Sequence, residues 1–225
     1  HQPNMFAVFK EQRDWAKIMK IENAVDLNKI VSTGKINDLI KIDETLKSNR
    51  MLQVAQEINA RKKDVKIVLV AGPSSSGKTT SSRKLCMYLQ SFGLTPKVIS
   101  MDDYFVERDQ TPLDEDGKPD YESIYALDID LFNQQLLDLI QGEEVQLPLF
   151  DFKEGKRKEG KKVKLLPNQP ILIEGIHALN EMVTSLIPKH QKFKIFISPH
   201  PQLNIDDHNP IMPTDLRLLR RIVRD

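Results

Sequence analysis

The sequence predicts a three-layer α/β fold with a mainly parallel sheet. Three observations support it: short apolar runs alternate with helical segments, the first run leads into a glycine-containing loop, and the composition is that of a globular protein, 40% apolar and 29% charged. Alternating strands and helices place helices on both faces of a parallel sheet. The 225 residues are enough for one such domain and a smaller appended segment.

The first 62 residues show helical periodicity and no strand pattern, and Gly34 is expected to divide this region into separate helices. We therefore predict a helical connector segment at 1–62 and an α/β domain at 63–225. The sequence ends in "LRLLRRIVRD" without a helix-stop residue. This ending suggests that the chain is part of a longer polypeptide and that the last part of the domain is missing.

The elements of the α/β domain follow from the pattern after Val65. Continuous apolar runs are typical of strands buried on both faces of a parallel sheet; they are "VKIVLVAG", "KVISM", "PILIEG" and "KFKIFIS". Helices are predicted in "SSRKLCMYLQSFG", which ends at Gly93, and from about Asp128 to Gln141. The segments "VQLPLFDF" and "KKVKLLP" predict a β-hairpin insertion around a basic turn.

The loop after the first predicted strand, "AGPSSSGKTT", contains a complete G-x-x-x-x-G-K-[ST] motif. Its glycines allow several backbone N–H groups to converge on phosphate oxygens, and the following helix adds its N-terminal dipole. Lys78 provides a charge for the β- and γ-phosphates, and the Thr79 hydroxyl can bind Mg²⁺. A chance match in a serine-rich loop is the alternative, which the flanking strand and helix disfavour. The motif predicts a P-loop NTPase fold that binds a nucleoside triphosphate; the expected contacts are Gly72, Ser74, Ser75, Ser76, Gly77, Lys78, Thr79 and Thr80.

Acidic residues follow two of the predicted strands. Asp102 and Asp103 end the strand "KVISM", and because adjacent side chains of an extended chain point in opposite directions, only one is expected to face the phosphates. Such a carboxylate could accept a proton from a hydroxyl, bind Mg²⁺, or be a surface charge. Glu174 ends another apolar strand, where it could hold Mg²⁺ directly or through water, or cap the next helix.

The bulk properties exclude several classes of function. A net charge of +1 argues against a dedicated nucleic-acid or membrane surface, and no apolar run approaches the length of a membrane span. The single cysteine, Cys86, fits a reducing compartment, so a cytoplasmic protein is expected. The basic segment "KEGKRKEGKK" is interpreted as a solvated hairpin tip, with an anionic partner as the alternative.

Six segments occur in the order of a known family: "GPSSSGKTT", "SMDDYF", "DYESIYALD", "LPLFDFKEGKR", "ILIEGIHAL" and "TDLRLLRRIVRD". Over residues 65–225 the chain resembles the uridine kinase/phosphoribulokinase family of P-loop kinases. It is most similar to bacterial uridine kinase-like proteins with an N-terminal threonyl-tRNA-synthetase-like region. The resemblance implies that 63–225 is a kinase domain that uses ATP and Mg²⁺ to phosphorylate a small-molecule hydroxyl, with the 5′-hydroxyl of uridine or cytidine favoured.

The same resemblance implies roles for individual residues. Asp102 would be the base, Lys78 a catalytic cation, and Thr79 and Glu174 the Mg²⁺ ligands. The implied substrate-side residues are Tyr104, Tyr121, Glu122, Phe152 and Arg157. The implied lid arginines are Arg217, Arg220, Arg221 and Arg224, for which a solvated basic helix face is the alternative.

Two positions depart from the pattern of nucleoside kinases, which usually have an aspartate at the position of Glu122 and a histidine at that of Gly155. A kinase for another sugar-like acceptor is therefore an alternative. An alternative from a different class is a nucleotide-dependent regulatory or RNA-associated ATPase, although nucleic-acid binding is not expected for this fragment. The sequence does not distinguish ATP from GTP, and it is compatible with a homo-oligomer.

Overall fold

The computed structural model describes residues 10, 13–198, 203–206 and 208–224, so the helical prediction for residues 1–9 lies outside the described part. The chain forms two compact units, residues 1–50 with 198–225 and residues 51–197. The predicted domains, 1–62 and 63–225, were divided where the helical sequence pattern gives way to strands, and this boundary stays a prediction.

The first unit is helical, in line with the sequence pattern of this region. Residues 13–19 are helical, and helices α2 (Ala24–Ser32), α3 (Ile36–Ala60) and α6 (Pro213–Arg224) follow along the chain, with α3 continuing into the second unit. Asn23 and Asp26 form a capping box at the start of α2. Gly34, in the left-handed conformation with φ 72°, separates α2 from α3 as predicted.

The second unit contains a four-stranded sheet with the order β2-β5-β1-β6. Its strands are β1 (Ile67–Ala71), β2 (Lys97–Ser100), β5 (Ile171–Glu174) and β6 (Lys192–Phe196). All of its pairings are parallel, which confirms the predicted parallel sheet. The register aligns Glu174 with Val70 of β1 and Ser100 of β2. The carboxyl ends of these three strands therefore meet at one edge of the sheet.

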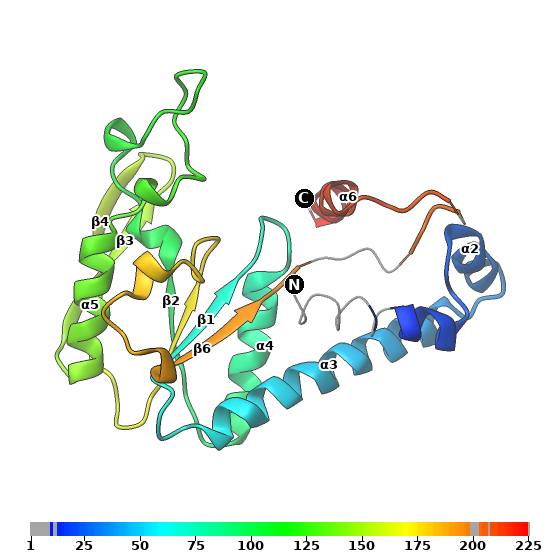
Figure 1. Cartoon of the computed structure of the whole chain (residues 1–225), viewed down its shortest axis with the longest axis horizontal. Helices are drawn as coiled ribbons and strands as arrows, with labels where there is room; N and C mark the ends of the chain where they lie inside the picture. Colours follow the sequence, from blue (N-terminus) through cyan, green and yellow to red (C-terminus); the bar gives the residue numbers. More distant parts are fainter. Residues whose placement is uncertain (1–9, 11–12, 199–202, 207, 225) are drawn as a thin grey trace. The chain divides into compact units, whose positions relative to one another are not determined.

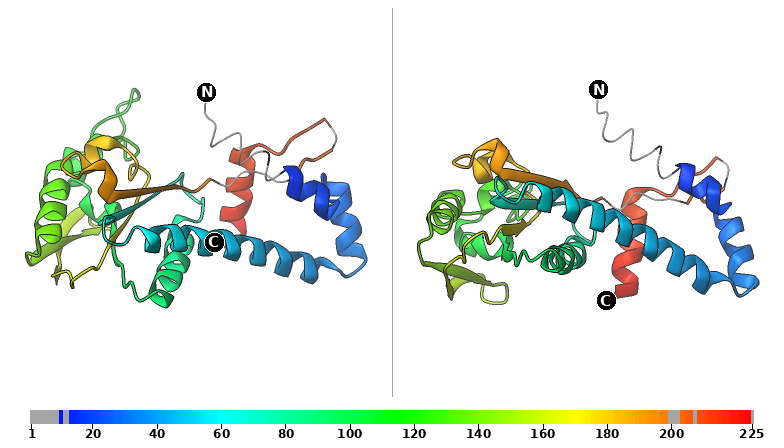
Figure 2. Two further views of the ribbon diagram at one scale, coloured as in Figure 1. Left: turned by 60° about the horizontal axis from the view of Figure 1, so that its bottom comes forward. Right: turned by 90° about the horizontal axis from the view of Figure 1, so that it is seen from below.

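Alternate residues of β1 face two different cores, which gives the three predicted layers (Figure 1, Figure 2). Ile67 and Leu69 belong to one core together with residues of helix α5 (Ile129–Gln141). Val68 and Val70 belong to a second core with residues of helix α4 (Lys78–Ser91) and of the end of α3. Side chains of a strand alternate between faces, so a strand buried on both faces is continuously apolar.

An antiparallel hairpin, β3 (Val145–Asp151) and β4 (Lys156–Val163), follows α5. The predicted hairpin is confirmed, but the prediction for its tip was wrong. Most of the basic segment at 153–162 belongs to strand β4 and not to the tip. The turn is short because Asp151 Oδ1 accepts hydrogen bonds from the backbone N–H groups of Lys153 and Glu154, and Gly155 adopts φ 68°. In the described part of the chain, no helix is both long and apolar enough to span a membrane.

Candidate active site

The phosphate-loop residues 72–77 connect β1 to α4, which confirms the strand–loop–helix context that the motif requires. Gly77 caps α4 in the left-handed conformation, φ 93°, a geometry that glycine adopts without steric cost. The Lys78 Nζ donates a hydrogen bond to the carbonyl oxygen of Pro73 at 3.0 Å. The ammonium group is thereby held against the start of the loop.

Gly72 is required by close packing rather than by an unusual φ. A Cβ at this position would overlap the carbonyl oxygen of Ile197 and lie 2.8 Å from Ser76 Oγ. Ile197 is held beside the loop because its N–H donates to the carbonyl oxygen of Ala71 at 2.7 Å. The start of the loop is therefore fixed against the chain that leaves β6.

Thr79 and Glu174 lie together although 95 residues separate them in sequence. The Thr79 hydroxyl donates to Glu174 Oε1 at 3.3 Å. The second oxygen, Oε2, is buried and has no hydrogen-bond partner among the described residues. A buried carboxylate oxygen without a partner is costly unless a cation or donor satisfies it. A hydroxyl beside such an oxygen fits Mg²⁺, which takes one or two protein oxygens and fills its other positions with water and phosphate. No group of three or more His, Cys, Asp or Glu residues that could hold a metal ion occurs in the described part of the chain.

Asp102 and Asp103 lie in a 3₁₀ turn, Met101–Tyr104, directly after β2. Asp103 Oδ1 accepts a hydrogen bond from the backbone N–H of Phe150 at 3.3 Å, so this carboxylate faces the hairpin. Asp102 lies in the electrostatic field of Lys78 and Glu174. Partial desolvation raises the pKa of Asp102, Lys78 opposes this effect, and Glu174 and Asp103 raise the pKa further. The two adjacent acids therefore have different surroundings.

The charge of Asp103 gives a testable effect on pH dependence. If Asp102 is the base, activity requires its ionised form and is lost as the pH falls through its pKa. The substitution Asp103→Asn removes a negative charge that raises this pKa, while the amide oxygen can still accept the hydrogen bond from Phe150. The acidic limb of kcat/KM should therefore move to lower pH. Asp109→Asn, an exposed control, should leave it in place; an unchanged limb in Asp103→Asn would contradict the coupling.

Tyr104 belongs to the core rather than to an open surface. It is 2% exposed, its ring packs edge-on against Phe132 at 4.7 Å, and its hydroxyl donates to Gln135 at 2.8 Å. Burial is the main cause that raises the pKa of its hydroxyl. Tyr104 thus anchors the end of the Met101–Tyr104 turn in the core, and its implied contact with the substrate stays a prediction.

Four aromatic residues form a cluster beside this turn: Phe105, Tyr121, Phe150 and Phe152. Phe105 is at the centre, with ring centroids 5.6 Å from Phe150 and 6.2 Å from both Tyr121 and Phe152. Tyr121 and Phe152 are 43% and 60% exposed. Phe105 and Phe150 were not among the predicted site residues, although the aromatic residues of "DDYF" and "LPLFDF" were the available signal. The cluster therefore forms an aromatic surface that is partly exposed.

Arg157 on β4 forms an ion pair with Asp128, Nη1 to Oδ2 at 2.8 Å, and both side chains are about three-quarters buried. Asp128 also caps α5, because its Oδ1 accepts from the N–H of Leu131 at 3.1 Å. Asp128 was predicted only as a helix start, and its tie to Arg157 becomes visible once the hairpin is placed. Glu122 is exposed, and its backbone N–H donates to Asp120 Oδ1 at 2.9 Å.

Arg108 covers the turn at Gly155. A Cβ at Gly155 would lie 2.6 Å from Arg108 Nε. The backbone N–H of Arg108 donates to the carbonyl oxygen of Gly155, and Nη2 donates to that of Phe152 at 2.9 Å. The space that a side chain at 155 would need is thus taken by an arginine from a different loop, a contact that the sequence alone did not indicate.

The predicted lid arginines belong to α6, in the first unit. The phosphate loop belongs to the second unit, so the approach of Arg217, Arg220 and Arg221 to the phosphates stays a prediction. The side chain of Arg224 lies outside the described residues.

A family model confirms the family seen in the motifs. The model of the Phosphoribulokinase / Uridine kinase family matches residues 67–225. This match starts at β1, so it does not bear on the predicted synthetase-like N-terminal region, which stays a prediction.

Curated relatives and a solved structure agree with this match. A uridine kinase of Macrococcus caseolyticus is 32% identical over 159 residues, covering 71% of this chain and 68% of the relative, and one of Ligilactobacillus salivarius is 33% identical over 160 residues, covering 71% and 66%. The chain thus spans about two thirds of the length of these relatives. A solved structure from Silicibacter sp. TM1040, described provisionally as a fructose transport system kinase, has a TM-score of 0.52 at 19% identity, covering 77% of this chain and 82% of that one. At this identity the likeness shows the fold alone.

Proposed function

Because the chain belongs to the phosphoribulokinase/uridine kinase family, and is therefore a phosphotransferase that acts on a hydroxyl, we propose that it uses ATP and Mg²⁺ to phosphorylate the 5′-hydroxyl of uridine or cytidine. The observation that carries this proposal is the meeting of three groups at one edge of the sheet. These are Lys78 against the phosphate loop, the Thr79–Glu174 pair, and Asp102 after β2. Ligands of open α/β sheets bind at this carboxyl edge.

Each group of residues has its own role in the proposed reaction. The loop amides and Lys78 bind the β- and γ-phosphates and hold the γ-phosphorus in line with the acceptor. Thr79 and Glu174 would hold Mg²⁺, which neutralises charge on the phosphates when bound. As the acceptor oxygen forms its bond to the γ-phosphorus, Asp102 takes the hydroxyl proton and the bond to the ADP oxygen breaks. The raised pKa of Asp102 makes it a stronger base than an ordinary aspartate once it is ionised.

Three observations support a pyrimidine nucleoside as the acceptor. The aromatic cluster around Phe105 presents exposed ring surface, on which a planar base could stack. The relatives at about one-third identity are named uridine kinases. The Arg157–Asp128 pair beside this region offers a fixed guanidinium whose remaining N–H groups can bind the acceptor.

A second candidate, a kinase for another sugar-like acceptor, is favoured by the surroundings of Gly155. Arg108 fills the space over this residue, and Glu122 replaces the shorter acid of nucleoside kinases. A guanidinium at this place suits an acceptor that carries more oxygen atoms or a negative charge.

The near-neutral charge and the single cysteine support a cytoplasmic setting with a small-molecule partner. A homo-oligomer is compatible with this function and is not needed for the arrangement of Lys78, Glu174 and Asp102, which all belong to the second unit.

The test is coupled ADP release by the full-length protein, with ATP and Mg²⁺, across a panel of nucleosides and free sugars. We expect uridine and cytidine to stimulate release several-fold or more over the acceptor-free rate. Stimulation only by another alcohol would keep the mechanism and replace the acceptor. Release that no acceptor stimulates would contradict the kinase proposal and favour a nucleotide-dependent ATPase.

A further inference from the structure

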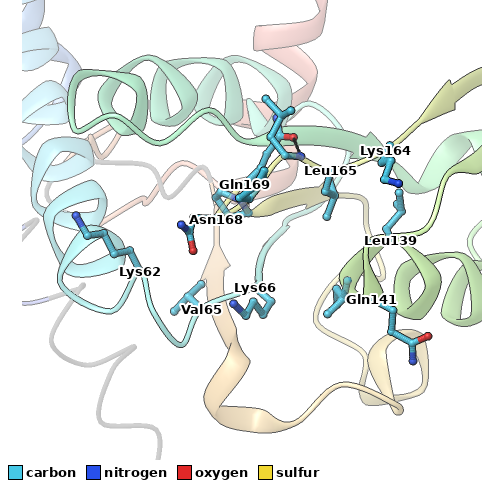
Figure 3. A pocket seen from close by; sticks show the side chains of 14 residues that line it. Lys62, Val65, Lys66, Leu139, Gln141, Lys164, Leu165, Asn168 and Gln169 are labelled. Carbon is cyan, nitrogen blue, oxygen red and sulfur yellow. Dashed lines mark hydrogen bonds between the residues drawn. The ribbon is translucent and has the colours of Figure 1, made fainter.

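A pocket of about 360 Å³ lies in the second unit, away from the residues of the candidate active site (Figure 3). Its walls come from the chain before β1, the end of α5 and the loop between β4 and β5. β1 and β5 are parallel and begin beside this pocket, whereas the phosphate loop follows the end of β1. The four residue steps along β1 place the two regions about 13 Å or more apart.

The pocket combines positive charge with an apolar surface. Its only ionisable lining residues are Lys62, Lys66 and Lys164, which are distributed around it (Figure 3). None of the three is in an ion pair within the part of the chain that the structure describes. The apolar lining residues are Val65, Leu139, Ile140, Leu165, Leu166, Pro167 and Pro170. Three ammonium groups around an apolar floor favour a ligand with an anionic group and a ring.

The rim of the pocket is fixed by its own hydrogen bonds. Gln169 Oε1 accepts from the N–H of Leu166 at 3.0 Å, and Nε2 donates to the carbonyl oxygen of Thr95 at 2.7 Å. Asn168, between these residues, adopts φ 59°, a left-handed conformation that costs free energy in a non-glycine residue. The loop thus presents the Asn168 amide from a preset position, so little order has to be gained when a ligand binds.

We infer that this pocket is a second binding site, separate from the phosphate loop, for a small organic phosphate of nucleotide size. Its volume lies within the range of ligand pockets, about 300–1,000 Å³. The ammonium groups of the lysines around the pocket attract the phosphate, the apolar floor contacts the ring, and the amides of Gln141 and Asn168 can hydrogen-bond to ring nitrogens or sugar oxygens. This inference does not depend on the proposed kinase reaction.

The experiment is methyl NMR of the full-length protein carrying Lys78→Ala, which weakens binding at the phosphate loop. The probes are AMP, adenosine and inorganic phosphate. We expect AMP to shift the methyl signals of Leu139, Ile140 and Leu165 in a saturable way. Adenosine and inorganic phosphate should each bind about tenfold more weakly or worse, because each lacks one half of the recognised chemistry.

Substitutions in the pocket separate a binding site from a structural role of the lysines. Lys66→Gln with Lys164→Gln should weaken AMP binding about tenfold or more. The control pair Lys41→Gln with Lys161→Gln removes the same charge outside the pocket and should have little effect. The inference is overturned if the methyl signals do not move or if adenosine binds as tightly as AMP. It is also overturned if the control pair matches the pocket pair, or if the pocket pair changes only the melting temperature.

Discussion

Asp102→Asn should lower kcat for phosphoryl transfer by roughly 10²- to 10⁴-fold, the usual contribution of a general base. Asparagine keeps the shape of the side chain but cannot accept the hydroxyl proton. Lys78 and the Thr79–Glu174 pair remain in place, so the affinity for ATP should change little. Asp102 and Lys78 lie in each other's electrostatic field. Because the substitution removes a negative charge that partly neutralises Lys78, we expect any change in ATP affinity to be a modest gain. Steady-state kinetics with saturating acceptor, together with nucleotide titration, measure both quantities.

The neighbouring acid is the matched control for this substitution. Asp103→Asn changes the same functional group one residue away, where the carboxylate faces the N–H of Phe150. Near neutral pH it should keep most of the activity, since its expected effect is on the acidic limb. Equal losses in the two variants would show that the turn, rather than a base at position 102, had been disturbed.

Gly72→Ala should destabilise the second unit and abolish nucleotide binding. The added Cβ would overlap the carbonyl oxygen of Ile197, and backbone atoms at this place cannot move aside without disturbing β1 or the chain after β6. Overpacking of this kind costs about 3 kcal/mol, and the shifted loop would lose its convergent N–H groups. Thermal unfolding with and without ATP measures both effects: a lower Tm, and no stabilisation by the nucleotide.

Gly117→Ala is the control for this prediction. Gly117 has φ 76° and nothing within 4 Å of an added Cβ, so only the cost of the left-handed conformation applies, about 1 kcal/mol. This variant should retain the stabilisation by ATP. If Gly72→Ala also retained it, the close packing of Gly72 against Ile197 would not be essential to the loop.

Local signals in the sequence were sufficient for the sheet and the phosphate loop. β1 and β5 are short apolar runs because both of their faces are buried, and the loop after β1 has a fixed spacing imposed by phosphate geometry. The start of α5 was also predictable, since Asp128 is an N-cap residue followed by an apolar helical pattern.

The contacts that the hairpin makes could not be predicted from the sequence. Asp103 meets Phe150, and Arg157 meets Asp128, only after the hairpin packs against the turn and α5. The length of β4 was also missed, because its lysines and glycine have low strand propensity and tertiary pairing with β3 overrides it. The Arg108–Gly155 contact joins two loops without any shared periodicity.

The central claim is that Lys78, Glu174 and Asp102 form one site that transfers a phosphoryl group to an acceptor hydroxyl. The most direct measurement follows the label of [γ-³²P]ATP, with full-length protein, Mg²⁺ and uridine, by separating phosphorylated nucleoside from inorganic phosphate. The account predicts that wild type places the label on the nucleoside in step with ADP formation, and that Asp102→Asn largely loses this transfer. Label found only in inorganic phosphate, at the same rate in both proteins, would contradict it.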